Sequence, residues 1–106
     1  MQYQEFGKTG LKVSKLCLGT WGIGGAGWDS YSDESRMDAI KAALECGINF
    51  IDTAPAYNAG KAECYVGETL NKLKKRREVV TSTKCGNKFV DGKYLRCGSK
   101  ESILKQ

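Results

Sequence analysis

The sequence predicts an α/β protein built around a parallel sheet. Three short apolar segments, residues 16–18, 48–51 and 79–83, alternate with two amphipathic stretches of helical length. Strands that alternate with helices in this way pair in parallel, because each helix carries the chain back across the sheet. We therefore expect one domain, residues 1–106, in which a β-hairpin precedes three βα-type strands and two to three helices.

The chain opens with a predicted β-hairpin over residues 3–14. Its polar and apolar residues alternate loosely around a turn cluster, Gly-Lys-Thr-Gly, at residues 7–10. Residues 16–18 then form the first predicted strand, which Gly19 stops. A glycine-rich stretch follows as far as Gly27, and we expect a loop there.

The first helix is predicted over residues 33–46. Met37, Ile40 and Leu44 recur at positions i, i+3 and i+7 and give this segment one apolar face. Ser32 is the expected N-cap. The helix therefore has one side with which to cover a sheet.

Two further strands and a second helix follow. Residues 48–51 form an apolar run that ends at Asp52, and residues 62–75 have an apolar stripe and a cationic end, as expected of a helix. Residues 79–83 are β-branched at four of five positions and end at Lys84. Both strands thus finish at an ionised side chain.

The last part of the chain predicts a second hairpin and the start of a third helix. In residues 88–95, the pair Asp91-Gly92 lies between short apolar pairs, which is typical of a two-residue β-turn. Ser99 occupies a suitable N-cap position for a helix that begins at residue 100.

Composition excludes several classes of function. The chain has 17 Lys and Arg against 12 Asp and Glu, and a net charge of +5 spread over 106 residues is a weak signal for nucleic acid. Histidine is absent, which excludes a Ser-His-Asp or Cys-His nucleophile and a His-ligated metal from this chain. We expect no nucleic-acid partner and no metal.

The cysteines and the apolar segments indicate a cytoplasmic protein. The five cysteines are scattered, odd in number and form no CxxC pair, so we expect reduced thiols. No apolar stretch approaches the ~20 residues that a membrane span requires. We therefore expect no association with a membrane.

A glycine motif offers one candidate binding site. Gly22, Gly24 and Gly27 fit the pattern G-x-G-x-x-G after a predicted strand, and Asp52 follows about 25 residues later, near the spacing of a dinucleotide fingerprint. That fingerprint requires a helix to open at the third glycine, so that its amides meet the pyrophosphate. Because residues 28–32 intervene here, a plain βα loop is favoured, with a dinucleotide-binding module as the alternative.

A stronger candidate site joins the ends of two strands. Asp52 and Lys84 end consecutive parallel strands, which lie about 4.8 Å apart, so their side chains can pair. Tyr57, five residues after Asp52, can reach the same place. An ammonium beside a phenol stabilises the phenolate, which suits a tyrosine acting as general acid toward a carbonyl oxygen. The alternative is structural: Asp52 caps the loop, Tyr57 packs on the surface and Lys84 is solvated.

Longer motifs surround these residues. They are residues 50–57 (FIDTAPAY), 60–63 (GKAE), 66–70 (VGETL), 81–84 (TSTK), 6–14 (FGKTGLKVS) and 18–22 (LGTWG). Taken together, these segments resemble the N-terminal third of the aldo-keto reductases. The resemblance covers nearly the whole chain.

The resemblance implies the N-terminal part of a (β/α)8 TIM barrel, with the first hairpin closing the bottom of the barrel. It also implies an NADPH-dependent oxidoreductase, with NADH as the other possible cofactor, that reduces small aldehydes or ketones to alcohols by hydride transfer. In this family pattern, Asp52, Tyr57 and Lys84 are catalytic, with Tyr57 as general acid. The expected cofactor-binding residues are Gly19, Thr20, Trp21 and Asp52, and the expected substrate-binding residues are Trp21 and Tyr57.

The chain departs from the family pattern in two respects. The fourth catalytic residue of the family, a histidine at the end of the next strand, has no counterpart here, and Ala62 stands where the family often has serine. A closed barrel normally takes about 250 residues. We therefore expect the isolated 106-residue chain to be inactive and either poorly folded or associated through open sheet edges, with a non-catalytic truncated fragment as the alternative to an enzyme.

Overall fold

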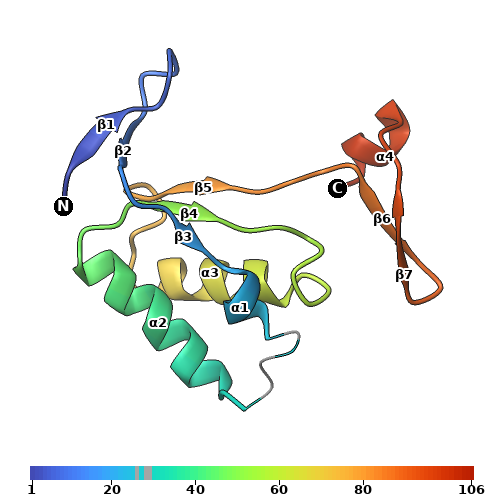
Figure 1. Ribbon diagram of the computed structural model, residues 1–106, viewed down its shortest axis with the longest axis horizontal. Coiled ribbons are helices and arrows are strands. Elements are labelled where there is room, and N and C mark those ends of the chain that lie inside the picture. The colour runs from blue at the N-terminus through green and yellow to red at the C-terminus, as the bar shows by residue number, and fades with distance from the viewer. Residues whose placement is uncertain (26, 28–29) are drawn as a thin grey trace.

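The computed structural model describes residues 1–25, 27 and 30–106. Its centre is a three-stranded parallel sheet with the order β3-β4-β5 (Figure 1). These strands are β3 (Leu18–Gly19), β4 (Phe50–Asp52) and β5 (Val80–Ser82). Gly19 pairs with Asp52, and Asp52 pairs with Ser82. The three strands therefore end side by side, at what we call the C-terminal edge of the sheet.

Three helices lie on one face of this sheet (Figure 1). They are α1 (Trp21–Gly24), α2 (Asp33–Glu45) and α3 (Lys61–Lys72). The predicted N-cap of α2 is confirmed, because Ser32 Oγ accepts a hydrogen bond from the backbone N–H of Ser35 at 3.2 Å. Helix α1 is a departure from the sequence prediction, which placed a loop there.

The core forms where α2 and α3 pack against the sheet. Ile40 and Leu44 of α2 and Val66 and Leu70 of α3 are buried around Ile51 of β4. The apolar faces of both helices thus pack against Ile51 in the central strand. The predicted apolar face of α2 is confirmed.

Both predicted hairpins are present. The first pairs β1 (Tyr3–Glu5) with β2 (Lys12–Ser14), and the second pairs β6 (Asn87–Val90) with β7 (Lys93–Arg96). Asp91 and Gly92 have φ angles of 49° and 78°. Two successive left-handed residues make the turn whose twist matches that of a hairpin. The short helix α4 (Lys100–Leu104) follows, and Ser99 caps it.

Two boundaries differ from the sequence prediction because of the way in which α2 and α3 end. After α2, the N–H of Ile48 donates to the carbonyl of Ala43, and after α3 the N–H of Lys75 donates to the carbonyl of Leu70. Both bonds belong to Schellman motifs, in which the residue after the C-cap is left-handed. Ile48 is therefore part of the end of α2 and not of β4, and α3 stops at Lys72 and not at residue 75.

The start of β4 is also fixed by the N-terminal hairpin. The side chain of Asn49 accepts a hydrogen bond from the Ser14 N–H at 2.6 Å and donates one to the Lys12 carbonyl at 3.0 Å. Asn49 thus interrupts the apolar run because it joins the sheet to β2. The strands β3 and β5 also differ from prediction: β3 starts at residue 18 and includes Gly19, and β5 covers only 80–82.

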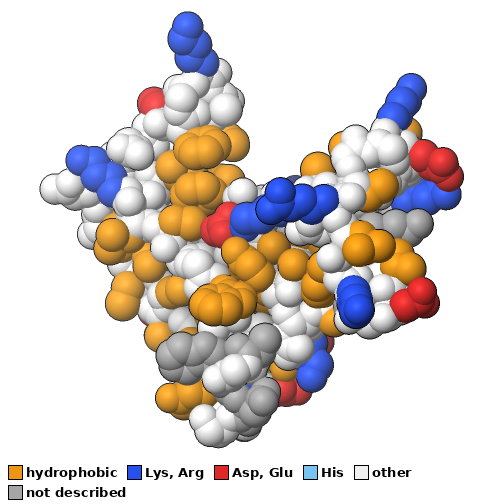
Figure 2. Space-filling view, turned by 45° about the vertical axis from the view of Figure 1, so that its right-hand side comes forward, with side chains coloured by type: hydrophobic (Ala, Val, Ile, Leu, Met, Phe, Trp, Pro, Cys, Tyr) orange, Lys and Arg blue, Asp and Glu red, His pale blue; other side chains and the backbone are white. Residues whose placement is uncertain are grey.

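Both outer edges of the sheet are open among the described residues. Among the described residues, β3 and β5 each pair with one neighbour only. In the space-filling view, a hollow separates two projecting arms, and hydrophobic side chains gather on this face (Figure 2). Leu16 and Trp21 are 62% and 61% exposed. Within the part of the chain that the structure describes, no helix has the length and hydropathy to cross a membrane.

Candidate active site

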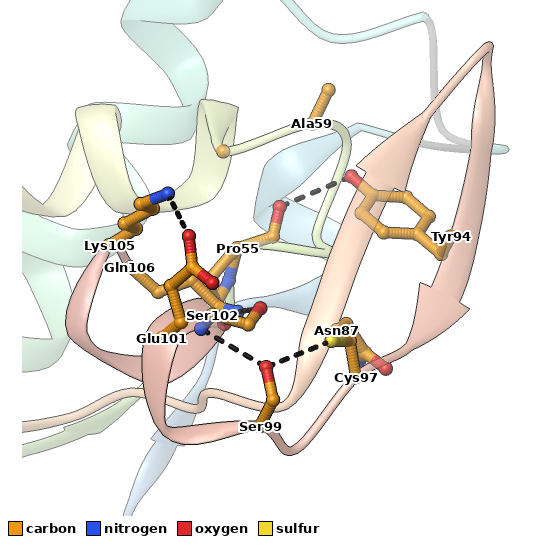
Figure 3. Close-up of a pocket in the computed structure, with 11 residues that line it drawn as sticks. Pro55, Ala59, Asn87, Tyr94, Cys97, Ser99, Glu101, Ser102, Lys105 and Gln106 are labelled. Carbon is orange, nitrogen blue, oxygen red and sulfur yellow. Dashed lines mark hydrogen bonds and ion pairs between the residues drawn. The ribbon is translucent and has the colours of Figure 1, made fainter.

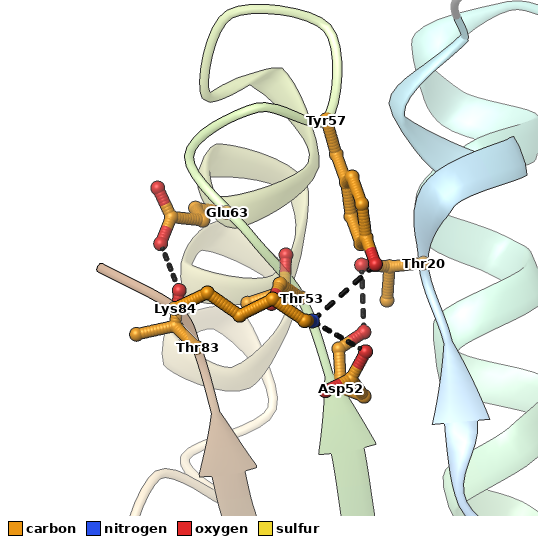
Figure 4. Close-up of polar contacts among 7 residues, drawn as sticks. All are labelled: Thr20, Asp52, Thr53, Tyr57, Glu63, Thr83 and Lys84. Carbon is orange, nitrogen blue, oxygen red and sulfur yellow. Dashed lines mark hydrogen bonds and ion pairs between the residues drawn. The ribbon is translucent and has the colours of Figure 1, made fainter. Parts of the chain in front are cut away.

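The ammonium group of Lys84 joins the three predicted catalytic residues (Figure 4). Lys84 Nζ donates hydrogen bonds to Asp52 Oδ2 at 2.7 Å, to Tyr57 Oη at 3.3 Å and to the carbonyl oxygen of Thr53 at 2.9 Å. It also lies 5.0 Å from the centroid of the Tyr57 ring. We refer to Asp52, Tyr57 and Lys84 as the Lys84 cluster.

The sheet places this cluster at its C-terminal edge. Asp52 is the last residue of β4, and Lys84 follows the end of β5 by two residues. The parallel ladder continues past Asp52, because the N–H of Thr53 donates to the carbonyl of Ser82 at 2.8 Å. The two side chains therefore start from adjacent strands and meet above the sheet.

Tyr57 reaches the cluster because its loop, residues 53–60, turns back over the strand ends. The N–H of Tyr57 donates to the carbonyl of Ala54, which closes a tight turn. The next three residues, Asn58, Ala59 and Gly60, have φ angles of 51°, 52° and 85°. A run of left-handed residues reverses the chain sharply and leads directly into α3.

The electrostatics of the cluster favour a charged lysine. Partial burial lowers the pKa of the Lys84 ammonium, but the hydrogen bonds to Asp52 and Tyr57 outweigh that effect, so the pKa is raised above its ordinary value. The side chains of Lys84 and Asp52 are 46% and 35% exposed. The cluster therefore stands at an edge that solvent or a ligand can reach.

The predicted cofactor-binding segment lies beside Asp52. Both the N–H and the hydroxyl of Thr20 donate to the Asp52 carbonyl oxygen at 3.0 Å, and the Thr20 side chain is fully buried. Gly19 pairs with Asp52 in the sheet, and Trp21 begins α1. The structure thus brings Gly19, Thr20 and Trp21 to the same edge as the Lys84 cluster.

A second polar contact supports the backbone next to Lys84. The hydroxyl of Thr83 donates to Glu63 Oε1 at 2.6 Å, which joins the segment after β5 to the first turn of α3 (Figure 4). Sequence reasoning did not identify Thr83. The sequence feature that could have indicated this contact is Glu63, an acidic residue in the first turn of the helix that closely follows Tyr57.

A hollow beside the Tyr57 loop does not contain the Lys84 cluster. A cavity of about 460 Å³ lies between the Tyr57 loop, the second hairpin and α4 (Figure 3). Pro55, Tyr94 and Ser99 are among its lining residues, and Tyr94 Oη donates to the Pro55 carbonyl at 3.2 Å. Since none of the three cluster residues lines this cavity, we do not assign the reaction to it.

Comparison with known proteins decides the family. A model of the aldo/keto reductase family matches residues 15–106. The chain belongs to the aldo/keto reductase family. Its members are oxidoreductases that act on carbonyl compounds with NAD(P)H.

Individual relatives agree with this assignment. The chain is 35% identical over 106 residues to the aldo-keto reductase YhdN of Bacillus subtilis (strain 168). The match covers all of this chain and 32% of the relative. It is 42% identical over 118 residues to an NADH-specific methylglyoxal reductase of Escherichia coli (strain K12), covering 100% of this chain and 36% of the relative. The chain therefore spans about a third of the length of these relatives.

Solved structures of aldo-keto reductases confirm the predicted fold class. The holo form of the aldo-keto reductase AKR11C1 from Bacillus halodurans superposes with a TM-score of 0.86 at 32% identity, over 99% of this chain and 33% of that one. The glycerol dehydrogenase AKR11B4 from Gluconobacter oxydans gives 0.81 at 34% identity, over 97% and 32%. The chain thus has the architecture of part of an aldo-keto reductase (β/α)8 barrel.

The glycine motif does not have the geometry of a dinucleotide fingerprint. Gly22 and Gly24 lie inside α1, and α2 begins only at Asp33, six residues after Gly27. Residues 28 and 29 of the intervening segment lie outside the described residues. In the part of the chain that the structure describes, no helix begins at the third glycine, so this geometry does not support the alternative of a Rossmann-type module. Among the described residues, no group of three or more potential metal ligands occurs.

Proposed function

We propose that Asp52, Tyr57 and Lys84 are catalytic residues of an NAD(P)H-dependent reductase that converts small aldehydes or ketones to alcohols. The observation that carries the proposal is the single ammonium of Lys84, hydrogen-bonded to both Tyr57 Oη and Asp52 Oδ2. In this arrangement Tyr57 is the acid, Lys84 is the cation that stabilises its conjugate base, and Asp52 is the carboxylate that holds the cation. Together they form a complete proton-donating unit.

In this mechanism, Tyr57 protonates the carbonyl oxygen of the substrate. The proton leaves Tyr57 Oη as negative charge develops on that oxygen, and the Lys84 ammonium stabilises the phenolate that remains. Asp52 keeps the ammonium in place through the 2.7 Å bond. When bound, the nicotinamide coenzyme supplies the hydride that reduces the carbonyl carbon.

The edge next to the cluster suits a planar ring. Trp21 exposes 61% of its surface, and a Cβ added at Gly19 would meet no atom within 4 Å. Open backbone at Gly19, which pairs with Asp52, and the exposed indole of Trp21 two residues later offer a surface on which an aromatic ring can lie. These observations support Gly19, Thr20, Trp21 and Asp52 as cofactor-binding residues, and Trp21 and Tyr57 as residues that contact the substrate.

We expect NADPH to be the preferred coenzyme. This expectation rests on the resemblance to the aldo-keto reductase family. The E. coli relative is named as NADH-specific, so NADH is the competing candidate. Rates measured with each coenzyme at equal concentration decide between them.

The test of the proposal is the variant Tyr57→Phe in the complete protein that the gene encodes. Loss of a general acid costs roughly a hundredfold or more, so carbonyl reduction should fall by at least that factor while coenzyme binding stays close to the parent. Tyr31→Phe is the matched control, because Tyr31 is an exposed tyrosine outside the cluster. Full turnover by Tyr57→Phe would refute the assignment.

A further inference from the structure

Helix α1 is one turn long, yet side chains from two other segments hold its C-terminal end. Arg36 Nη1 donates to the carbonyl oxygens of Gly22 at 3.3 Å and Ile23 at 2.9 Å. Asn58 Nδ2 donates to the carbonyl oxygen of Gly24 at 2.7 Å. The last three carbonyl groups of α1 therefore all have a side-chain donor, and that of Gly22 also accepts a backbone hydrogen bond from the Gly25 N–H at 3.2 Å. Side chains thus supplement the few backbone donors at the end of so short a helix.

Arg36 holds α1 from the side of α2. Its side chain is buried, with the residue 7% exposed, and its Nε also donates to the carbonyl of Tyr31 at 3.2 Å. A guanidinium at the C-terminal end of a helix interacts favourably with the carbonyl dipoles there. Arg36 thus fixes α1 to the first turn of α2.

Asn58 holds α1 from the side of the Tyr57 loop. It follows Tyr57 directly and has a φ angle of 51°, a left-handed conformation that asparagine tolerates better than most residues. The two backbones also touch: a Cβ at Gly24 would lie only 3.1 Å from the Tyr57 carbonyl oxygen. The amide of Asn58 therefore connects two segments that are already in close contact.

The other end of α1 is fixed to Asp52. Thr20, which precedes α1, donates two hydrogen bonds to the Asp52 carbonyl oxygen. Helix α1 thus spans from the backbone of Asp52 to the loop that carries Tyr57, and Trp21 lies at its first position. Both ends of α1 are therefore bonded to segments that carry residues of the Lys84 cluster.

We propose that Asn58 is a positioning residue that, with Arg36, locks α1 against the Tyr57 loop and so fixes Trp21 at the coenzyme-binding edge. The proposal rests on the proposed function, because Trp21 matters here as a residue that contacts the coenzyme or the substrate. Asn58 donates no bond to Asp52 or Lys84. We therefore expect Asn58 to shape the binding surface, while the hydrogen bonds within the Lys84 cluster do not depend on its amide.

The test compares two neighbouring left-handed residues in the complete protein. Asn58→Gly removes the amide donor and keeps the backbone conformation accessible, because glycine adopts positive φ freely. Ala59→Gly is the matched control: Ala59 also has a positive φ, of 52°, but its methyl group can donate no hydrogen bond. Asn58→Asp is the second test variant, since it keeps the size and the left-handed preference but presents no donor when ionised.

The expected kinetic result is a split between KM and kcat. The loss of one hydrogen bond should raise the KM for NAD(P)H about fivefold in Asn58→Gly and Asn58→Asp, while kcat and the shape of its pH profile stay close to the parent. Ala59→Gly should retain the parent KM. A KM unchanged in both Asn58 variants, or raised equally by Ala59→Gly, would overturn the proposal.

A spectroscopic measurement separates this proposal from the proposed function. With Trp28 and any tryptophan outside residues 1–106 replaced by phenylalanine, fluorescence reports on Trp21 alone, because residues 1–106 contain two tryptophans. Free of coenzyme, Asn58→Gly should lower the emission anisotropy of Trp21 and increase its quenching by acrylamide, and Ala59→Gly should not. If Tyr57→Phe keeps full turnover, the catalytic assignment fails while this measurement still decides the role of Asn58; unchanged fluorescence in Asn58→Gly contradicts the positioning role whatever the activity.

Discussion

Lys84 Nζ lies 2.7 Å from Asp52 Oδ2, although 32 positions separate the two residues in the chain. The parallel pairing of β4 with β5 accounts for this contact, because both residues leave the sheet at the same edge. The same ammonium donates to Tyr57 Oη, so one ion pair links strand pairing to the proposed proton donor.

The ion pair between Lys84 and Asp52 should make stability depend on pH in the alkaline range. Partial burial lowers the pKa of Lys84, but the hydrogen bonds to Asp52 and Tyr57 outweigh that effect, so the pKa is raised above its ordinary value of 10.5. The folded state therefore binds the proton more tightly than the unfolded state. The contribution is therefore complete below the unfolded pKa and is lost as pH rises through the folded one.

Urea unfolding of the complete protein measures this effect. Between about pH 9 and about pH 11, the free energy of unfolding should fall more in the parent than in Lys84→Met, which has no ammonium at position 84 to titrate. The difference should be small because the Lys84 side chain is 46% exposed. Equal losses in the two proteins would show that the pair contributes nothing to folding.

Removal of the Thr83 hydroxyl should lower kcat, and removal of the Thr81 hydroxyl should not. Thr83→Val removes the 2.6 Å bond to Glu63 and loosens the segment that carries Lys84, so kcat should fall about two- to tenfold. The Oγ1 atom of Thr81 is buried and has no hydrogen-bond partner among the described residues. Thr81→Val should therefore leave kcat unchanged and keep or raise the melting temperature; a fall in kcat for this control alone would contradict the assignment.

Substitutions of two glycines in helices should have opposite effects on stability. Gly24→Ala places a Cβ within 3.1 Å of the Tyr57 carbonyl oxygen and 3.3 Å of Ala62 Cβ, which should cost about 1–3 kcal/mol. Gly67→Ala in α3 meets no atom within 4 Å and should stabilise the protein by about 0.5–1 kcal/mol through helix propensity. Chemical denaturation measures both changes, and a neutral Gly24→Ala would show that α1 and the Tyr57 loop do not pack closely.

The isolated 106-residue chain should either fold poorly or associate, and it should not reduce carbonyl compounds. The two outer strands β3 and β5 each leave one side unpaired among the described residues, and large apolar side chains such as Leu16 and Trp21 are exposed. Open strands and apolar surface favour pairing between copies. Size-exclusion chromatography and an NADPH oxidation assay check this; a compact monomer with measurable turnover would contradict it.

Sequence reasoning found most of the fold because its signals were local. The apolar spacing of Ile40 and Leu44, the Ser32 cap and the Asp91-Gly92 turn each depend on a few neighbouring residues, and the structure has all of them as predicted. The Asp52 and Lys84 contact was also predictable, because parallel strands must end at one edge.

The sequence did not predict α1, because propensity argues against a helix with two glycines in four residues. This helix forms through tertiary contacts: Arg36 and Asn58 satisfy its carbonyl groups from segments 12 and 34 positions away from Gly24. The early end of α3 was missed for a similar reason, since the left-handed φ of 55° at Lys74 is an unusual conformation for lysine.

A double-mutant cycle of Tyr57→Phe and Lys84→Met in the complete protein tests the central claim most directly. If Lys84 acts through Tyr57, removing the ammonium from an enzyme that already lacks the phenol should cost little further, because groups that act as a unit give non-additive losses. The account predicts that kcat/KM for carbonyl reduction in the double variant equals that of Tyr57→Phe within about threefold. Losses from the two substitutions that multiply in the double variant would show that Lys84 and Tyr57 act independently and would contradict the account.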